Sequence, residues 1–405
     1  MAQVRDGVVK RGKSWSYVIR VTNPDTGLSK PKWVSGFQTE AAAKAARDEA
    51  RVAARRGEFV NRSTVTVSSY LSDWLDGHAL EVRPRTLSGY REILDRYVVP
   101  RIGRMRLQAV QPATLTRLYL QLLEGGGKNG RPLSRRTVDY VHATLRKALG
   151  DAVLIGGLIP SNPAERAKRP RRVTRQIGDV WDAEQLRTFL EHMADHQWFA
   201  LYRLAAYTGA RRGELLALRW ADVDWNAPSI RIRASAGMVG KQRVEGTTKS
   251  GRERTVSIDP GTVAALQRHR NRQMQAQTMA GASWVGEGHL FVNGFGKPIC
   301  PSAPSQRLSL AVAAFNEGHD DKADSVTLPR SRFHDLRHVH ATLLLRAGVP
   351  VHVVAARLGH ADPAITLRVY AHVIKEHAAE VAGTFAALLE PPEEADPEGE
   401  DESAC

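Results

Sequence analysis

Residues 334–372 read HDLRHVHATLLLRAGVPVHVVAARLGHADPAITLRVYAH, and this stretch contains the most informative pattern in the sequence. Two basic side chains, His334 and Arg337, lie three residues apart at its start. Side chains at this spacing share one face of a helix. A Leu-Gly-His triplet ends at His360, and Tyr370 follows near the end of the stretch. The stretch therefore predicts helices that bring several cations close to one tyrosine.

The helix that carries this tyrosine has a clear start in the sequence. Asp362 can accept a hydrogen bond from the first helical turn, and Pro363 suits the first helical position. A helix of normal geometry then places Tyr370 about two turns from this start. No other tyrosine follows Tyr207, so these features single out Tyr370.

Two charged motifs lie upstream of this stretch. Residues 207–215 read YTGARRGEL and contain Arg211 and Glu214. Residues 247–258 read TTKSGRERTVSI, in which Lys249 is expected to open a hairpin-like strand. Both motifs add cations to the histidines and arginine of the later stretch.

Side chains of these types supply what the cleavage of a phosphodiester bond requires without a metal. A nucleophile attacks phosphorus, cations neutralise two non-bridging oxygens, and a general acid protonates the leaving 5′ oxygen. Arginine offers paired planar donors that match phosphate oxygens, and loss of one well-placed donor to a transition state typically costs about 2.7–4 kcal/mol. A tyrosine with its ordinary pKa of about 10 is a poor nucleophile at neutral pH. Neighbouring cations and a base must therefore assist it.

Each motif alone has a plainer explanation. An Arg–Glu pair on a helix is often a surface ion pair, HxLRH can be an exposed basic helix, and Leu-Gly ends many helices. A single tyrosine is usually a core aromatic residue. All of the motifs in this order favour one common site, and the remaining histidines His338, His340 and His372 are expected to be structural or supporting.

The combination resembles the tyrosine recombinase family, and the resemblance covers nearly the whole chain. It implies an integrase of a phage or integrative element, because an extra arm-type domain precedes the rest. The catalytic residues that it implies are Arg211, Lys249, His334, Arg337, His360 and Tyr370, with Glu214 as a supporting residue. No position of this set departs from the family pattern.

By this resemblance, Tyr370 attacks the scissile phosphate to give a 3′-phosphotyrosyl link and a free 5′ hydroxyl. Lys249 is the expected acid for the leaving oxygen, and His334 is the expected base-like partner of Tyr370. The enzyme would in this way integrate or excise a mobile element. The covalent link conserves the energy of the phosphodiester bond, so neither a metal, nor ATP, nor another cofactor is expected.

The resemblance also implies roles for the other residues and an assembly. Arg211 and Arg337 hold the non-bridging oxygens, and His360 donates a hydrogen bond to the same group. Glu214 orients Arg211 or, alternatively, braces the helix. Members of the family act as tetramers on two DNA duplexes and exchange strands through a Holliday junction. A C-terminal helix at about Glu376–Leu389 is expected to dock on a neighbouring subunit or, alternatively, on its own domain.

The expected fold class is multidomain. It comprises a small α+β N-terminal domain, an all-α four-helix core-binding domain, and a mostly α catalytic domain with a small β-sheet (the DNA breaking-rejoining enzyme fold). The expected boundaries are 1–60 for the arm-type DNA-binding domain, 64–168 for the SAM-like core-binding domain, 176–390 for the catalytic domain, and 391–405 for an acidic, disordered tail.

Local patterns predict the elements of these domains. Strands are expected at Ser14–Val21 and Lys32–Phe37, and a helix capped by Thr39 is expected from Glu40 to about Arg56. Helices with apolar periodicity are expected to begin near Val67, at Pro84, at Pro112 and after Ser134. In the mostly helical last domain, strand-like alternation occurs at residues 230–234 and 255–258.

The chain is basic. Its formal net charge is +15, although the tail from Glu390 onward contains eight acidic residues and neither Lys nor Arg. A body this basic favours a polyanionic partner, usually nucleic acid, over charge that serves solubility alone. The residues expected to contact DNA, for which a solvated face is the plainer alternative, are Lys10, Arg11, Lys13, Lys168, Arg169, Arg171 and Arg172.

Other classes of protein fit the composition poorly. The two cysteines support neither a disulfide framework nor a zinc cluster, and no HExxH motif occurs. No apolar run reaches about 18 residues, and the N-terminus lacks an apolar signal core. A cytoplasmic protein without a membrane partner is expected. Its expected partners are double-stranded DNA with attachment sites, other copies of the chain in a homotetramer, and an excision factor or host DNA-bending factor.

Two other functions fit part of the pattern. A type IB topoisomerase shares the tyrosine chemistry, but the arm-like domain and the Leu-Gly-His triplet favour a recombinase. A DNA-binding regulator with an inactive catalytic domain would tolerate the loss of catalytic residues, whereas this sequence keeps all six.

Overall fold

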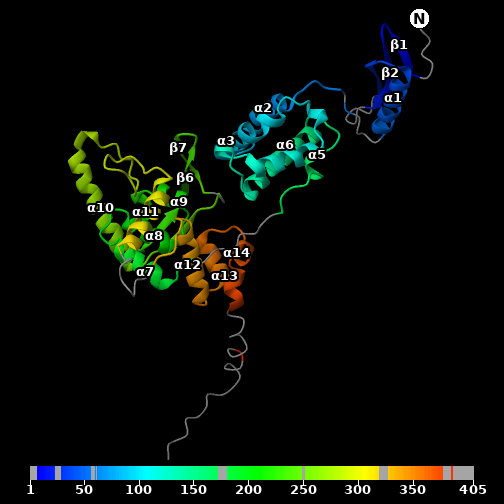
Figure 1. Cartoon of the computed structure of the whole chain (residues 1–405). Coiled ribbons are helices and arrows are strands. Elements are labelled where there is room, and N and C mark those ends of the chain that lie inside the picture. The colour runs from blue at the N-terminus through cyan, green and yellow to red at the C-terminus, as the bar shows by residue number, and fades with distance from the viewer. Residues whose placement is uncertain are drawn as a thin grey trace, which may run out of the picture. The chain divides into compact units, whose positions relative to one another are not determined.

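The computed structural model describes residues 7–22, 29–55, 60, 62–171, 180–248, 251–318, 327–376 and 385. The chain divides into two compact units, Met1–Thr174 and Arg175–Cys405, and each is described by itself. Figure 1 shows their helices and strands and labels most of them. The expected acidic tail and nearly all of the expected helix at Glu376–Leu389 lie outside the described residues.

A three-stranded antiparallel sheet begins the first unit. In the order in which they pair, its strands are β1 (Val8–Arg11), β2 (Ser14–Thr22) and β3 (Ser29–Phe37). Tyr17 and Ile19 of β2 are buried together, because side chains two residues apart in a strand point to the same face. Helix α1 (Glu40–Arg55) packs against this face, and the Thr39 hydroxyl caps it by accepting a hydrogen bond from Ala42 N at 3.2 Å. The expected strands and helix are confirmed, and β1 is added to them.

Helices form the rest of the first unit. They are α2 (Val67–His78), α3 (Pro84–Ile93), α4 (Val99–Ile102), α5 (Pro112–Gly125) and α6 (Arg135–Leu154). Thr66 and Ser134 cap α2 and α6 by accepting hydrogen bonds from first-turn N–H groups. Inside the apolar core, the Tyr70 hydroxyl donates to the Ala148 carbonyl oxygen at 2.5 Å. The four expected helices are confirmed, and a π-helical stretch at Leu94–Val98 extends the second of them into α4.

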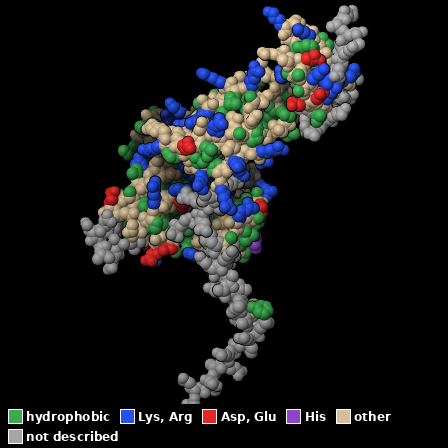
Figure 2. All heavy atoms as spheres, turned by 45° about the vertical axis from the view of Figure 1, so that its right-hand side comes forward, with side chains coloured by type: hydrophobic (Ala, Val, Ile, Leu, Met, Phe, Trp, Pro, Cys, Tyr) green, Lys and Arg blue, Asp and Glu red, His purple; other side chains and the backbone are tan. Residues whose placement is uncertain are grey.

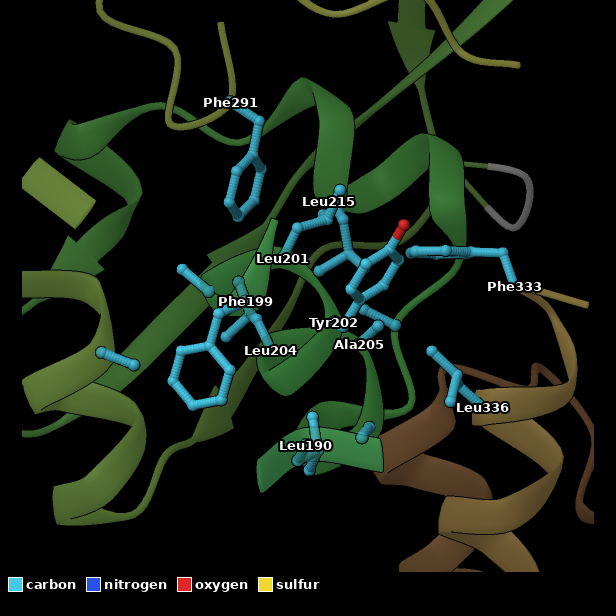
Figure 3. Close-up of a cluster of buried hydrophobic side chains, with 14 of the residues drawn as sticks. Leu190, Phe199, Leu201, Tyr202, Leu204, Ala205, Leu215, Phe291, Phe333 and Leu336 are labelled. Carbon is cyan, nitrogen blue, oxygen red and sulfur yellow. The ribbon is translucent and has the colours of Figure 1, made fainter. Parts of the chain in front are cut away.

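Helices also dominate the second unit. They are α7 (Ala183–His192), α8 (Phe199–Thr208), α9 (Arg212–Ala217), α10 (Pro260–Ala280), α11 (Ala303–Glu317), α12 (Asp335–Arg346), α13 (Val351–Leu358) and α14 (Pro363–Glu376). Helix α8 lies in the core, where Tyr202 and Leu204 are fully buried. The side chains that Figure 3 shows around α8 come from other elements and include Leu190, Leu215, Phe291, Phe333 and Leu336.

Short strands interrupt the helices of the second unit. Strands β4 (Val223–Asp224), β5 (Ser229–Ile232) and β8 (Arg254–Ser257) form an antiparallel sheet in that order, and β6 (Ala234–Val239) pairs with β7 (Gln242–Thr247) in a hairpin. The strands expected near residues 230–234 and 255–258 correspond to β5 and β8, each of which begins one residue earlier. The sequence pattern does not predict the hairpin, because its strands contain glycines and few β-branched side chains.

Helices α12, α13 and α14 pack together around a separate apolar cluster. Ala341 and Leu345 from α12, Val354 and Leu358 from α13, and Tyr370 from α14 are all buried in it. Figure 1 shows the three helices side by side. The aromatic ring of Tyr370 is therefore part of a core that fixes the position of its hydroxyl.

Three negative findings apply to the described part of the chain. No helix there has the length and hydrophobicity needed to cross a membrane. No group of three or more His, Cys, Asp or Glu side chains there is arranged to hold a metal ion. Cys300 is exposed and forms no disulfide with another described residue.

The substitution Leu145→Ala on α6 should lower the free energy of unfolding of the first unit by about 2–5 kcal/mol, because it leaves a cavity in a packed core. Leu145 is 1% exposed, whereas Leu154 on the same helix is 85% exposed. The control Leu154→Ala should change that free energy by less than about 0.5 kcal/mol. Denaturant unfolding of the full chain, followed through hydrogen exchange of the amides of α5 and α6, measures both. Equal effects of the two substitutions would contradict this core.

Candidate active site

The backbone turns sharply at Gly209, directly after α8. Gly209 has a φ of 61°, in the left-handed region that glycine adopts without strain. A Cβ atom at this position would lie 2.7 Å from both His340 Cδ2 and Leu358 Cδ2. Glycine is thus required here by conformation and by space. The turn directs the Gly209 carbonyl oxygen toward α12.

Arg337 projects from the first turn of α12 and is only 4% exposed. Its Nη1 donates to the Gly209 carbonyl oxygen at 2.7 Å, and its Nη2 donates to His360 Nε2 at 2.8 Å. Burial, together with the nearby charge of Arg211, lowers the pKa of Arg337 to about 9, so the guanidinium keeps its charge at neutral pH. A buried cation with fixed neighbours favours the binding of an anion.

His360 follows α13, which ends at Gly359 in the left-handed conformation with a φ of 70°. His360 Nδ1 lies 2.7 Å from Thr366 Oγ1, while Nε2 accepts the hydrogen bond from Arg337. The proton of the neutral ring is therefore on Nδ1, which donates to the threonine hydroxyl. Burial and the charge of Arg337 lower the pKa of His360 to about 4, which agrees with a neutral ring.

Glu214 on α9 organises a second group of charges. Its side chain is 1% exposed, and its carboxylate accepts hydrogen bonds from Arg211 N and Arg211 Nη1, both at 2.9 Å. Arg254 of β8 donates to the same two oxygens at 2.7 and 3.3 Å. Burial by itself raises the pKa of Glu214, but the hydrogen bonds and charges of Arg254 and Arg211 outweigh it and hold the pKa below its usual value. The ionised carboxylate thereby fixes Arg211, whose side chain is 25% exposed.

Tyr370 is 1% exposed, and its φ of −114° and ψ of 18° depart from helical values within α14. Its Oη lies 2.9 Å from His338 Nδ1. Burial raises the pKa of Tyr370 to about 12, and the charge of Arg337 opposes this rise to a smaller extent. The phenol is therefore protonated at neutral pH.

His338, rather than His334, contacts the tyrosine hydroxyl, which differs from the role that the sequence predicts for His334. His334 lies one turn earlier, at the N-terminus of α12, and its ring meets the His338 ring edge-on with centroids 5.1 Å apart. Residues four apart on a helix share a face, so spacing alone does not distinguish the two histidines. Their positions relative to α14 distinguish them, because of the two it is His338 that lies within hydrogen-bond distance of Tyr370 Oη.

Some residues singled out in the sequence lie outside the described part of the chain. They are Lys249, Arg172 and the side chain of His372. The described strands nearest to Lys249 in sequence end at Thr247 and begin at Arg254, so no described strand opens at Lys249.

The basic residues expected to contact DNA are exposed where the structure describes them. These are Lys10, Arg11, Lys13, Lys168, Arg169 and Arg171. The Arg11 guanidinium lies 4.0 Å from the centre of the Trp33 ring, and Arg169 Nη1 pairs with Asp139 Oδ1 at 2.6 Å. Figure 2 shows Lys and Arg side chains at many places on the face in view and acidic side chains at fewer.

Arg254, Arg357 and Thr366 complete the site but are not predicted from the sequence. Arg357 of α13 donates to His340 Nε2 at 3.2 Å and to the Tyr207 carbonyl oxygen at 3.0 Å, which ties α13 to α12 and to the end of α8. The two arginines are among many in the chain. The sequence gives some indication of Thr366, because it lies one helical turn before Tyr370 and so on the same face of the helix.

Comparison with known protein families gives three matches along the chain. Residues 179–377 match the phage integrase family. Residues 66–123 match the N-terminal SAM-like domain of phage integrases, and residues 8–52 match the arm DNA-binding domain.

Individual relatives and solved structures agree with these matches. A tyrosine recombinase XerC-like protein of Caldanaerobacter subterraneus is 26% identical over 387 residues, which are 90% of this chain and 94% of the relative. The ICEBs1 integrase of Bacillus subtilis is 25% identical over 80% of this chain and 84% of its own length. The Tn1549 transposon integrase, solved with a circular intermediate DNA, aligns with a TM-score of 0.65 and 20% identity over 78% of this chain and 99% of its own. A lambda integrase dimer bound to a core site aligns with a TM-score of 0.55 and 15% identity over 91% and 95% of the two chains, and both structures share the fold.

Stability should depend on pH through His340, which is buried on α12. His340 Nδ1 donates to the Ala206 carbonyl oxygen at 2.8 Å, and Nε2 accepts from Arg357. Burial and the charge of Arg357 lower the pKa of His340 to about 4, whereas a histidine in an unfolded chain has a pKa of about 6.5. Between these values the unfolded chain binds more protons. This contribution to stability is therefore complete above about pH 6.5 and is lost as the pH falls toward about 4.

The substitution His340→Asn should lower the stability of the second unit at neutral pH and also reduce its dependence on pH, because the titrating group is gone. Urea midpoints of the full chain, measured from about pH 7 to about pH 5, test this. The control His352→Asn, at an exposed position on α13, should keep the wild-type slope. An unchanged slope in His340→Asn would contradict the assignment.

Proposed function

Because the chain belongs to the phage integrase family of tyrosine recombinases, we propose that Tyr370 is the nucleophile with which it cleaves and rejoins DNA. The chain is a site-specific recombinase of the integrase type. The proposal for the site rests mainly on Arg337, which is hydrogen-bonded both to the Gly209 carbonyl oxygen and to His360. His360 is in turn hydrogen-bonded to Thr366, on the same helix as Tyr370. These hydrogen bonds link the Gly209 turn, α12, the end of α13 and α14, and they support a proposal that puts the scissile phosphate beside Arg337.

The proposed reaction exchanges one phosphoester for another. Tyr370 Oη attacks phosphorus, a bond between this oxygen and phosphorus forms, and the bond from phosphorus to the 5′ oxygen breaks. The products are a 3′-phosphotyrosyl link and a 5′ hydroxyl. Attack by a 5′ hydroxyl on this link reverses the step, rejoins a strand and releases the tyrosine. The covalent link conserves the phosphoester, so no ATP is required.

Arg211 and Arg337 neutralise the non-bridging oxygens in this proposal. Each guanidinium has five N–H donors, and the contacts described above use only part of them. His360 can donate to the same phosphate once its proton is on Nε2, because the Thr366 hydroxyl can then donate to Nδ1 instead. Preorganised donors of this kind stabilise charge that develops in the transition state.

The proposal extends to the rest of the chain. Residues 1–60 contact arm-type sites, residues 64–168 contact the core site, and residues 176–390 carry out catalysis. The exposed basic residues of the first unit, among them Lys10 and Arg169, supply phosphate contacts. A lambda integrase tetramer of the same fold has been solved on a Holliday junction, which supports a homotetramer on two DNA duplexes. A cytoplasmic location and an excision or DNA-bending factor belong to the same proposal.

The substitution Tyr370→Phe removes only the nucleophilic oxygen. It should abolish covalent adduct formation and recombination while leaving DNA affinity nearly unchanged. The probe is a nicked duplex that carries the site selected by the full chain from a randomised DNA pool. Denaturing gels score the adduct, and Tyr140→Phe, at a 46% exposed position, is the control that should still form it. An adduct of normal yield with Tyr370→Phe would refute the assignment.

Lys249 is proposed as the acid that protonates the leaving 5′ oxygen. Lys249→Ala should slow single-turnover cleavage of the selected nicked duplex by about 10²–10⁴-fold, the usual range for general acid catalysis. The effect should nearly disappear when sulfur replaces the 5′ bridging oxygen, because a thiolate leaves without a proton. Lys241→Ala, at an exposed position in the β6–β7 hairpin, serves as the control. Equal slowing on both substrates would exclude Lys249 as the acid.

A further inference from the structure

We propose that His338 accepts the proton of the Tyr370 hydroxyl when this oxygen attacks phosphorus. The inference rests on the proposed function, because it requires Tyr370 to be the nucleophile. His338 directly follows Arg337 on α12, and it is the residue that contacts the reacting oxygen.

The geometry of the pair is that of a direct hydrogen bond. His338 Nδ1 lies 2.9 Å from Tyr370 Oη, and the two ring planes are inclined by 58° with centroids 5.8 Å apart, so the rings do not stack. Within the part of the chain that the structure describes, no other side chain is hydrogen-bonded to this oxygen. The tyrosine ring and the helix that carries His338 belong to the same apolar cluster. Packing therefore holds the phenolic oxygen and the imidazole nitrogen at hydrogen-bond distance.

The protonation states of the two rings set the direction of the bond. Burial lowers the pKa of His338 below its ordinary value and raises the pKa of Tyr370 to about 12, so both rings are neutral near pH 7. A neutral phenol donates one proton, and a neutral imidazole with its proton on Nε2 accepts at Nδ1. The reverse direction would leave the phenolic proton without an acceptor among the described residues. The bond therefore runs from Oη–H to Nδ1, which is the direction of proton transfer during the attack.

The neighbouring residues of α12 have different partners. His334 meets the His338 ring edge-on with centroids 5.1 Å apart, so its described contact is with that ring rather than with the hydroxyl. Arg337 points to the Gly209 carbonyl oxygen and to His360. One helix thus directs Arg337 to the phosphate position and His338 to the nucleophile.

Several titratable and charged groups act on the positive charge that His338 gains during proton transfer. The titratable and charged groups around it are Tyr370, His334, Asp335, Arg337, Arg332 and His360. Asp335, at the start of the same helix, favours a protonated His338, whereas Arg337 and Arg332 oppose it. The imidazole is therefore neutral before the attack and has a carboxylate nearby when it takes the proton.

The complete step conserves protons. The bond from Oη to phosphorus forms as the phenolic proton passes to His338 Nδ1. The bond from phosphorus to the 5′ oxygen breaks as this oxygen takes a proton from Lys249. In the rejoining step the 5′ hydroxyl attacks and gives its proton back to Lys249, while the tyrosine leaves and takes back its proton from His338.

The test compares His338→Asn and His338→Ala with the wild-type full chain on the selected nicked duplex. The amide oxygen of asparagine can accept the phenolic hydrogen bond but cannot take the proton. Both substitutions should slow single-turnover adduct formation by about 10²–10⁴-fold, the usual range for a general base, while DNA affinity stays at the wild-type level. The rate of His338→Asn should rise with pH where the wild-type rate is constant, because hydroxide must then remove the proton. His352→Asn should match the wild type.

A second change tests the same role by chemical rescue. Fluorotyrosine at position 370 has a more acidic phenol, so it should restore most of the rate to His338→Asn and have little effect in the wild-type background. Wild-type rate and pH profile in His338→Asn, or no rescue by fluorotyrosine, would overturn the role of His338. Absence of any adduct with the wild type, or an adduct that persists in Tyr370→Phe, would instead defeat the proposed function, so the two failures are distinguishable.

Discussion

One buried guanidinium joins parts of the chain that are far apart in sequence. Arg337 donates to the carbonyl oxygen of Gly209, 128 residues earlier, and to His360, 23 residues later. Neither partner carries a negative charge, because one is a backbone carbonyl oxygen and the other is a neutral imidazole. Burial lowers the pKa of Arg337 to about 9, so the folded protein already holds this cation at a cost. In the proposed function, a phosphate beside Arg337 supplies a negative charge that neither of these two partners provides.

Tyr370 lies in the interior of the second unit. It is 1% exposed, its ring belongs to the apolar cluster of α12, α13 and α14, and its hydroxyl is hydrogen-bonded to His338. Burial raises the pKa of Tyr370 to about 12 and lowers the pKa of His338, so the phenol is protonated and the imidazole is neutral near pH 7. The departure from helical φ and ψ occurs at Tyr370 itself.

Much of the fold and of the site follows from local sequence, and the failures have physical causes. Asp362 and Pro363 mark the start of α14 and Ser134 caps α6, because each of these roles depends on neighbouring backbone alone. The contact of His338 was not predicted, since it depends on the approach of a second helix. Likewise, Arg254 pairs with Glu214 across 40 residues, and no local pattern distinguishes it from other arginines.

The most direct measurement is peptide mapping by mass spectrometry of the covalent complex trapped on a nicked duplex. We predict that a nucleotide is attached to the peptide that contains Tyr370 and that fragmentation locates the added mass on the phenolic oxygen. A nucleotide attached to any other side chain would contradict it.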